Sequence, residues 1–180
     1  MTETITDKGA ERASSRQAEV PAARLTRAFH DRYKELLEGV PAGEPTWVTT
    51  GGPGGGVYGT LAKLSASQAS AEVDGTTVAA HAEHLRWALQ LVNDHFAGVE
   101  PTGDWSESWL VKEVDAATWN ALRSELKEAG TKLLANILEL QQWGDGMGIT
   151  GALASYGHTA YHLGALRQLQ KRVEGSEDVR

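Results

Sequence analysis

The chain has 180 residues, no cysteine and a formal net charge of −7, from 17 basic and 24 acidic residues. This length predicts one domain that can bury a sizeable core. The missing cysteines exclude disulfides, thiolate metal ligands and a cysteine nucleophile, and the acidic balance without a run of Lys or Arg argues against a nucleic-acid partner. Since no apolar stretch approaches the ~20 residues that span a bilayer, we expect a cytoplasmic protein without a membrane partner.

Polarity divides the chain into one domain and two tails. Residues 1–20 are rich in Thr, Glu, Ser, Arg and Ala with little to bury, so we expect a mobile N-terminal tail. This segment has no apolar centre and is therefore not a secretory signal. The domain is expected at residues 21–174, and the charged residues 175–180 are expected to form a C-terminal tail.

The first part of the domain predicts one long helix and a loose connection. Apolar residues recur at helical spacing from Pro21, which suits a first helical turn, until Pro41 stops the helix. The glycine-rich segment 51–56 lacks the Gly-Lys-Ser/Thr ending of a phosphate-binding loop and predicts a flexible connection. The stretch around Leu61 and Leu64 predicts a short helix or an extended packing segment.

A second long helix is expected after the Asp-Gly turn at residues 74–75, with Thr76 or Thr77 as its N-cap and its end near Gly98. Asn93 is among the residues predicted to face outward. The helical period predicts that the inward face consists of Val78, His81, His84, Leu85, Ala88, Leu91, Val92, His95 and Phe96.

A long connection, residues 99–114, follows the second helix and carries two tryptophans. Trp105 and Trp109 could line the mouth of a site or pin the connection to the domain. A packing role is the favoured interpretation for these two residues, as it is for all six tryptophans of the chain.

The rest of the domain predicts two more helices. Asp115 is placed to cap a third helix that breaks near Gly144, and a fourth covers about residues 149–173. No segment alternates with the period of a strand. The expected fold is therefore all-α, a four-helix bundle with a long connection between its second and third helices.

Two histidines of the fourth helix predict a metal site. His158 and His162 are four residues apart on a stripe of small and apolar residues, so both rings face inward from one side of the helix. His84 is the preferred third ligand because it lies near the middle of its helix, and His81, one turn away, remains its substitute. His95 lies ~16 Å further along the axis than His84 and cannot share the ion. Spacing alone leaves metal ligation and ordinary core packing equally open.

Two short segments carry a further pattern. Residues 77–85 read Thr-Val-Ala-Ala-His-Ala-Glu-His-Leu, and residues 158–164 read His-Thr-Ala-Tyr-His-Leu-Gly. Together with the long second connection, they resemble the DinB-like (YfiT-like) superfamily of metal-binding four-helix bundles over roughly residues 22–173. The resemblance implies that the metal ligands are His84, His158 and His162. Where the family often has Gln after the final Gly, this chain has Ala165, which changes the surroundings of the site rather than its ligands.

The resemblance also implies a function. Members with known activity are metal-dependent transferases or isomerases that use a low-molecular-weight thiol of the mycothiol or bacillithiol type. A three-histidine site for a divalent Zn, Ni or Fe ion would activate such a thiol toward a small-molecule substrate, or would activate water in a hydrolase. Arg86 and Arg167 could orient an anionic substrate. No catalytic residue is assigned, and a homodimer is expected at the level of the family.

A non-catalytic protein is the alternative from another class. In that case the helical bundle would hold a structural metal, sequester a ligand or dimerise through a helix face. Metal ligation by histidines would in either case make stability fall below about pH 6.5, where free histidines take up protons.

Overall fold

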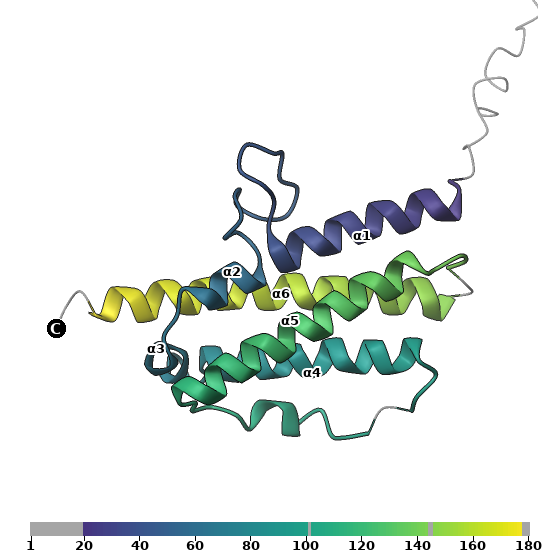
Figure 1. Ribbon diagram of the computed structural model, residues 1–180. Coiled ribbons are helices and arrows are strands. Elements are labelled where there is room, and N and C mark those ends of the chain that lie inside the picture. Colours follow the sequence, from purple (N-terminus) through teal and green to yellow (C-terminus); the bar gives the residue numbers. More distant parts are fainter. Residues whose placement is uncertain (1–19, 101, 144–145, 178–180) are drawn as a thin grey trace, which may run out of the picture.

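A computed structural model describes residues 20–100, 102–143 and 146–177 of the chain (Figure 1). Over these residues the chain is helical, with one isolated β-bridge between Val73 and Thr76, and the all-α prediction is confirmed. None of these helices is both long and apolar enough to cross a membrane. The elements are α1 (Ala22–Glu38), α2 (Val57–Ala62), α3 (Ala66–Ser70), α4 (Val78–Phe96), the 3-10 helix η1 (Glu107–Trp109), α5 (Ala116–Leu138) and α6 (Gly146–Glu177).

Both N-caps expected from the sequence are confirmed. The Thr77 hydroxyl accepts a hydrogen bond from the backbone N–H of Ala80 at 3.1 Å at the start of α4. The carboxylate of Asp115 accepts one from the backbone N–H of Thr118 at 2.7 Å at the start of α5. Each bond satisfies an N–H that the first helical turn leaves without a partner.

The tails and the last helix differ from their predicted bounds. Helix α6 continues to Glu177, so the first residues of the expected C-terminal tail are helical. The expected N-terminal tail, apart from residue 20, and residues 178–180 lie outside the described part of the chain. Residues 144–145 also lie outside it, but the third helix, α5, already ends at Leu138, before the break that was expected near Gly144.

The four long helices pack against one another around one apolar core. Helix α4 contacts α5 and α6, and α1 contacts the same two helices, so residues far apart in sequence share one interior (Figure 1). The stretch around Leu61 and Leu64 belongs to the short helices α2 and α3 and the link between them, and both leucines are buried. The residues that α5 buries in this core recur at helical spacing and are Trp119, Leu122, Leu126, Ala129, Gly130, Leu133, Leu134 and Ile137.

In the second half of α4, the residues that are buried differ from those predicted to face inward. Asn93, expected outside, is fully buried, because its side-chain amide donates to the Ala129 carbonyl at 2.9 Å and its oxygen accepts from Asn136 at 2.9 Å. His95 and Phe96, expected inside, are exposed. A polar pair between α4 and α5 thus replaces apolar packing at this end of the helix.

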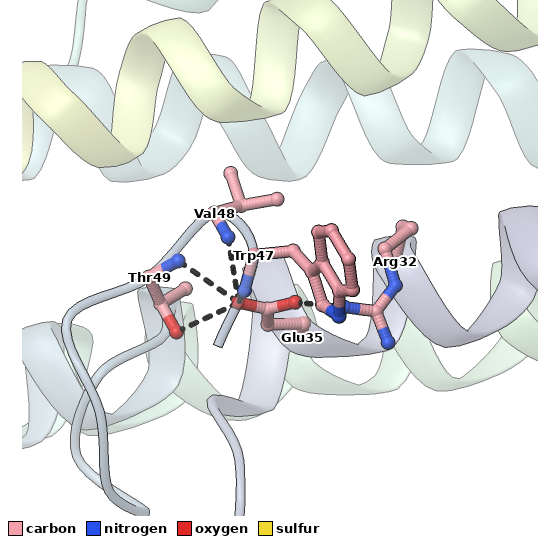
Figure 2. Close-up of polar contacts among 5 residues, drawn as sticks. All are labelled: Arg32, Glu35, Trp47, Val48 and Thr49. Carbon is pink, nitrogen blue, oxygen red and sulfur yellow. Dashed lines mark hydrogen bonds and ion pairs between the residues drawn. The ribbon is translucent and has the colours of Figure 1, made fainter. Parts of the chain in front are cut away.

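The connection after α1 is tied to that helix by one buried carboxylate. Oxygen Oε1 of Glu35 accepts hydrogen bonds from the backbone N–H groups of Trp47, Val48 and Thr49 at 2.8, 2.8 and 2.9 Å, and from the Thr49 hydroxyl at 3.2 Å (Figure 2). The other oxygen pairs with the Arg32 guanidinium at 2.6 Å. We call this group of five residues the Glu35 clamp.

Two glycines of the same connection, Gly55 and Gly56, allow close packing of the backbone. A Cβ atom on Gly56 would lie 2.5 Å from the backbone nitrogen of Gly39 and 2.6 Å from the Leu37 carbonyl oxygen. The Arg167 guanidinium of α6 donates to the Gly55 carbonyl. Only residues without side chains allow the backbone to pass this close to the end of α1.

Candidate metal centre

Three histidines from two helices meet in the interior. His84 comes from α4, while His158 and His162 come from α6. Atom Nε2 of His158 lies 3.0 Å from Nε2 of His84 and 3.0 Å from Nε2 of His162. One ligand atom from each ring can be chosen so that all three lie within 4.8 Å of one another. The structure therefore brings together the three residues singled out from the sequence, and we call them the histidine cluster.

Ser108 of η1 fixes the hydrogen of His84. Its hydroxyl donates to the Trp105 carbonyl oxygen at 2.7 Å, which uses its only hydrogen. Its oxygen therefore accepts from Nδ1–H of His84, 2.7 Å away. A neutral imidazole with its hydrogen on Nδ1 carries a lone pair on Nε2, which is the atom that faces His158.

His81 plays the corresponding part for His162. Their Nδ1 atoms are 2.9 Å apart, so one of the two donates to the other. Donation from His162 leaves the lone pair of its Nε2 facing His158. His81 does not belong to the three-nitrogen group, so it does not take the place of His84 and instead supports a ligand from behind.

The tryptophans of the long connection cover this cluster. The Trp109 ring stacks on His84 with centroids 4.0 Å apart and an angle of 18° between planes, and the Trp105 ring meets His84 edge-on at 4.5 Å. Sequence reasoning favoured packing alone for these residues and missed Ser108 altogether. A signal was present, because Trp105, Ser108 and Trp109 stand at positions i, i+3 and i+4, which share one face of a helical turn.

Burial keeps the histidines neutral. It is the main cause that lowers the pKa of His84 to about 4 and the pKa of His162 to about 3, and the neighbouring imidazoles add to the effect. Burial also lowers the pKa of His81 and of His158. Neutral imidazole is the form that binds a metal ion.

The donor set fits a divalent cation. Nε2 of His84 carries a lone pair, so its 3.0 Å contact with Nε2 of His158 is a hydrogen bond only when His158 holds its hydrogen on Nε2. In that state Nε2 of His158 has no lone pair left to accept from His162, and in the other state it meets His84 lone pair to lone pair. The rings alone therefore do not satisfy both contacts, whereas a cation among the three nitrogens would. Tetrahedral coordination with metal–nitrogen bonds of 2.0–2.1 Å places nitrogens roughly 3.3 Å apart, close to the two 3.0 Å distances at Nε2 of His158.

A cavity of about 790 Å³ lies beside the cluster, between the four long helices. His158, half-buried, is the member of the histidine cluster that lines it, whereas His84 and His162 are almost fully buried. Small molecules can therefore approach the three nitrogens from the side of His158.

Comparison of the chain with models of known protein families, with curated proteins and with solved structures finds no match. The resemblance to the DinB-like superfamily therefore rests on the two histidine segments and the long connection between the second and third predicted helices. The chemistry of the site has to be argued from this chain's own residues.

Proposed function

We propose that this protein is a metal-dependent enzyme of the DinB-like four-helix-bundle type that transfers a low-molecular-weight thiol to an electrophilic small molecule. The observation that carries the proposal is the convergence of three imidazole Nε2 atoms beside a cavity of about 790 Å³. A metal with a purely structural role needs four closed ligand positions and no neighbouring cavity. The cavity is therefore what favours an enzyme over a structural site.

Held by three neutral imidazoles, a divalent Zn, Ni or Fe ion would keep its charge and an open coordination position, and would supply the Lewis acidity that lowers the pKa of a thiol. The protein's own residues orient the histidine rings and shield them. Ser108 holds the hydrogen of His84 on Nδ1, His81 is the hydrogen-bond partner of Nδ1 of His162, and the rings of Trp105 and Trp109 pack on His84.

The proposed reaction is a substitution at carbon. The thiol sulfur forms a bond to the electrophilic carbon, and the leaving group departs with its bonding electron pair. The thiol proton passes to the leaving group or to solvent. If water replaces the thiol as the nucleophile, the same site works as a hydrolase.

Elemental analysis of protein purified without a histidine tag tests the metal half of the proposal. We expect about one divalent ion per chain in the wild type and background levels in the His158→Ala, His162→Ala double variant. His30→Ala is the matched control, because His30 lies on α1 and pairs with Asp31 at 2.9 Å, away from the cluster. A wild type with no more metal than the double variant would refute the proposal.

Conjugation to 1-chloro-2,4-dinitrobenzene tests the catalytic half, with mycothiol, bacillithiol and glutathione supplied in turn. Metal-loaded wild type is expected to accelerate conjugation with at least one thiol, and the double variant should not. Productive turnover with water alone would reassign the protein as a hydrolase. Bound metal without exchange of any ligand would make the site structural.

A further inference from the structure

The cavity beside His158 is walled mainly by carbon. Aromatic rings contribute much of its lining, and among the described lining residues there is no Lys, Arg, Asp or Glu. A charged ligand entering it would lose its hydration without gaining an ion pair, whereas an apolar ligand gains by leaving water. The ring-bearing lining residues, besides the histidines, are Phe29, Tyr33, Trp87, Phe96, Trp105 and Trp143.

Two polar side chains on this wall, Tyr33 and Ser155, already have partners. Thr159 donates to the Ser155 carbonyl at 2.9 Å, and its oxygen lies 2.8 Å from the Tyr33 hydroxyl. The Tyr33 hydroxyl also lies 2.8 Å from the Ser155 hydroxyl. Among the described residues, the buried side-chain polar atom left without a partner is Nε of Arg123, which does not line the cavity.

The two arginines that could have oriented an anion are engaged elsewhere. Arg86 pairs with Glu83 at 2.6 Å, and Arg167 donates to the Gly55 carbonyl. Neither lines the cavity. Within the described lining there is therefore no lysine or arginine that would recognise a carboxylate or phosphate.

We propose that this cavity binds an uncharged, mainly aromatic or aliphatic molecule and directs one end of it toward His158. Binding requires only the cavity. The statement that the bound molecule is the electrophile of thiol transfer rests on the proposed function above. The protein thereby selects apolar substrates over anionic ones of the same size.

A pair of fluorescent probes tests this selection. N-phenyl-1-naphthylamine is neutral, and 1-anilinonaphthalene-8-sulfonate has the same ring skeleton with one negative charge. Titration of metal-loaded and chelator-treated protein should give saturable binding of one neutral probe per chain. The anionic probe should bind the chelator-treated protein at least about tenfold more weakly than the neutral probe, because there its charge would be buried unpaired.

A cavity-filling variant locates the binding. Gly151 of α6 lines the cavity, and a Cβ atom added there meets nothing within 4 Å, so Gly151→Phe should fold and should weaken the neutral probe at least about tenfold. Gly164→Phe is the matched control, on the same helix with the same open surroundings but outside the lining. Ala88→Phe fills the cavity from α4 in case the first variant is unstable.

The outcomes separate this inference from the proposed function. Equal binding of the neutral probe to wild type, Gly151→Phe and Ala88→Phe would overturn the inference, as would equal affinity for the two probes. Loss of probe binding as the protein dimerises would show that a second copy covers the cavity, and would also overturn it. Probe binding by a protein that takes up no divalent ion when one is supplied would sustain the inference while refuting the proposed function. Thiol transfer without probe binding would do the reverse.

Discussion

Two regions of this protein bury polar side chains among the same helices, and they do so in opposite ways. In the Glu35 clamp, a carboxylate meets three backbone N–H groups, a hydroxyl and a guanidinium, so every acceptor faces a donor from the chain. In the histidine cluster, the Nε2 atoms of three rings face one another, and the hydrogen-bond partners of His84 and His162 lie behind these rings, at Nδ1.

The difference separates a structural polar group from a binding site. A buried polar group costs free energy unless it is satisfied, so the clamp is complete in itself and holds a connection in place. The cluster offers three nitrogen ligands, and under the proposed function a cation from solution completes it. The two regions should therefore respond to different perturbations.

Metal removal should produce the largest effect, and only through the cluster. A site filled at 100 to 1,000 times its dissociation constant stabilises the fold by about 2.7 to 4.1 kcal/mol, so chelation should lower the wild-type melting temperature by several degrees. Differential scanning calorimetry with and without EDTA measures this shift. The His162→Ala variant should melt at one temperature in both buffers, and an EDTA-sensitive transition in that variant would contradict the assignment of His162 as a ligand.

Acid should affect the two regions over different pH ranges. In the metal-free protein burial lowers the pKa of His84 to about 4 and of His162 to about 3, while unfolded histidines titrate near ~6.5. The unfolded chain thus takes up protons first, and stability falls as the pH drops below ~6.5. Burial raises the pKa of Glu35, but its hydrogen bonds and Arg32 outweigh burial and hold it below the usual range, so the clamp weakens only below ~4.3.

Thermal melts of metal-free protein between about pH 7 and about pH 5 check this separation. The wild type should lose stability across that range, and His162→Ala should lose less because one buried imidazole is gone. Glu35→Gln should follow the same slope as the wild type. A melting temperature of the wild type that stays constant would show that the histidines are not held neutral by the fold.

Breaking the clamp should destabilise the fold without touching the metal. Glu35→Ala leaves three backbone N–H groups and Arg32 without their acceptor and should cost about 3 kcal/mol of unfolding free energy. Urea denaturation measures this loss, and elemental analysis should find unchanged metal content. Glu38→Ala is the matched control, since Glu38 is on the same helix, is exposed and pairs with Lys34 only at 3.8 Å. Loss of metal in Glu35→Ala would mean that the two regions are coupled.

Removing the support behind a ligand should have a smaller effect than removing the ligand. His81→Ala deprives Nδ1 of His162 of its partner and should weaken metal binding about 10- to 100-fold. His81→Asn, whose side-chain oxygen can accept the same hydrogen, should recover part of that loss, and His95→Ala, an exposed histidine of the same helix, should leave metal affinity unchanged. Competition titration with a metal indicator measures all three. Equal affinities in His81→Ala and the wild type would remove His81 from the site.

The sequence predicts those features of the two regions and their helices that depend only on residues close together along one helix. Thr77 and Asp115 cap their helices through bonds three residues away, and His158 and His162 share a face because they are four apart. His84 could be chosen over His95 by depth along the helix axis alone. Each of these inferences needs only helix geometry.

The remaining features depend on contacts between distant segments. Asn93 is polar and was expected outside, but its partners Ala129 and Asn136 lie on another helix. Glu35 gathers N–H groups from a connection 12 to 14 residues away, and Ser108 reaches His84 across 24 residues. No periodic pattern encodes such pairings, because their distances are set by how the helices pack.

The smallest expected effects come from removing one hydroxyl beside Glu35 and one beside the histidine cluster. These two variants best distinguish a role in stability from a role in metal binding. Thr49→Val removes the longest of four bonds to Oε1 of Glu35, at 3.2 Å, and should cost about 1 kcal/mol of stability with no change in metal affinity. Ser108→Ala removes the acceptor that holds the hydrogen on Nδ1 of His84, so metal affinity should fall while the stability of the metal-free protein changes by less than about 1 kcal/mol. Urea melts of metal-free protein and competition titrations of both variants form a two-by-two test. If Ser108→Ala lost only stability, or Thr49→Val lost metal affinity, the division between a self-satisfied clamp and a cation-dependent cluster would be wrong.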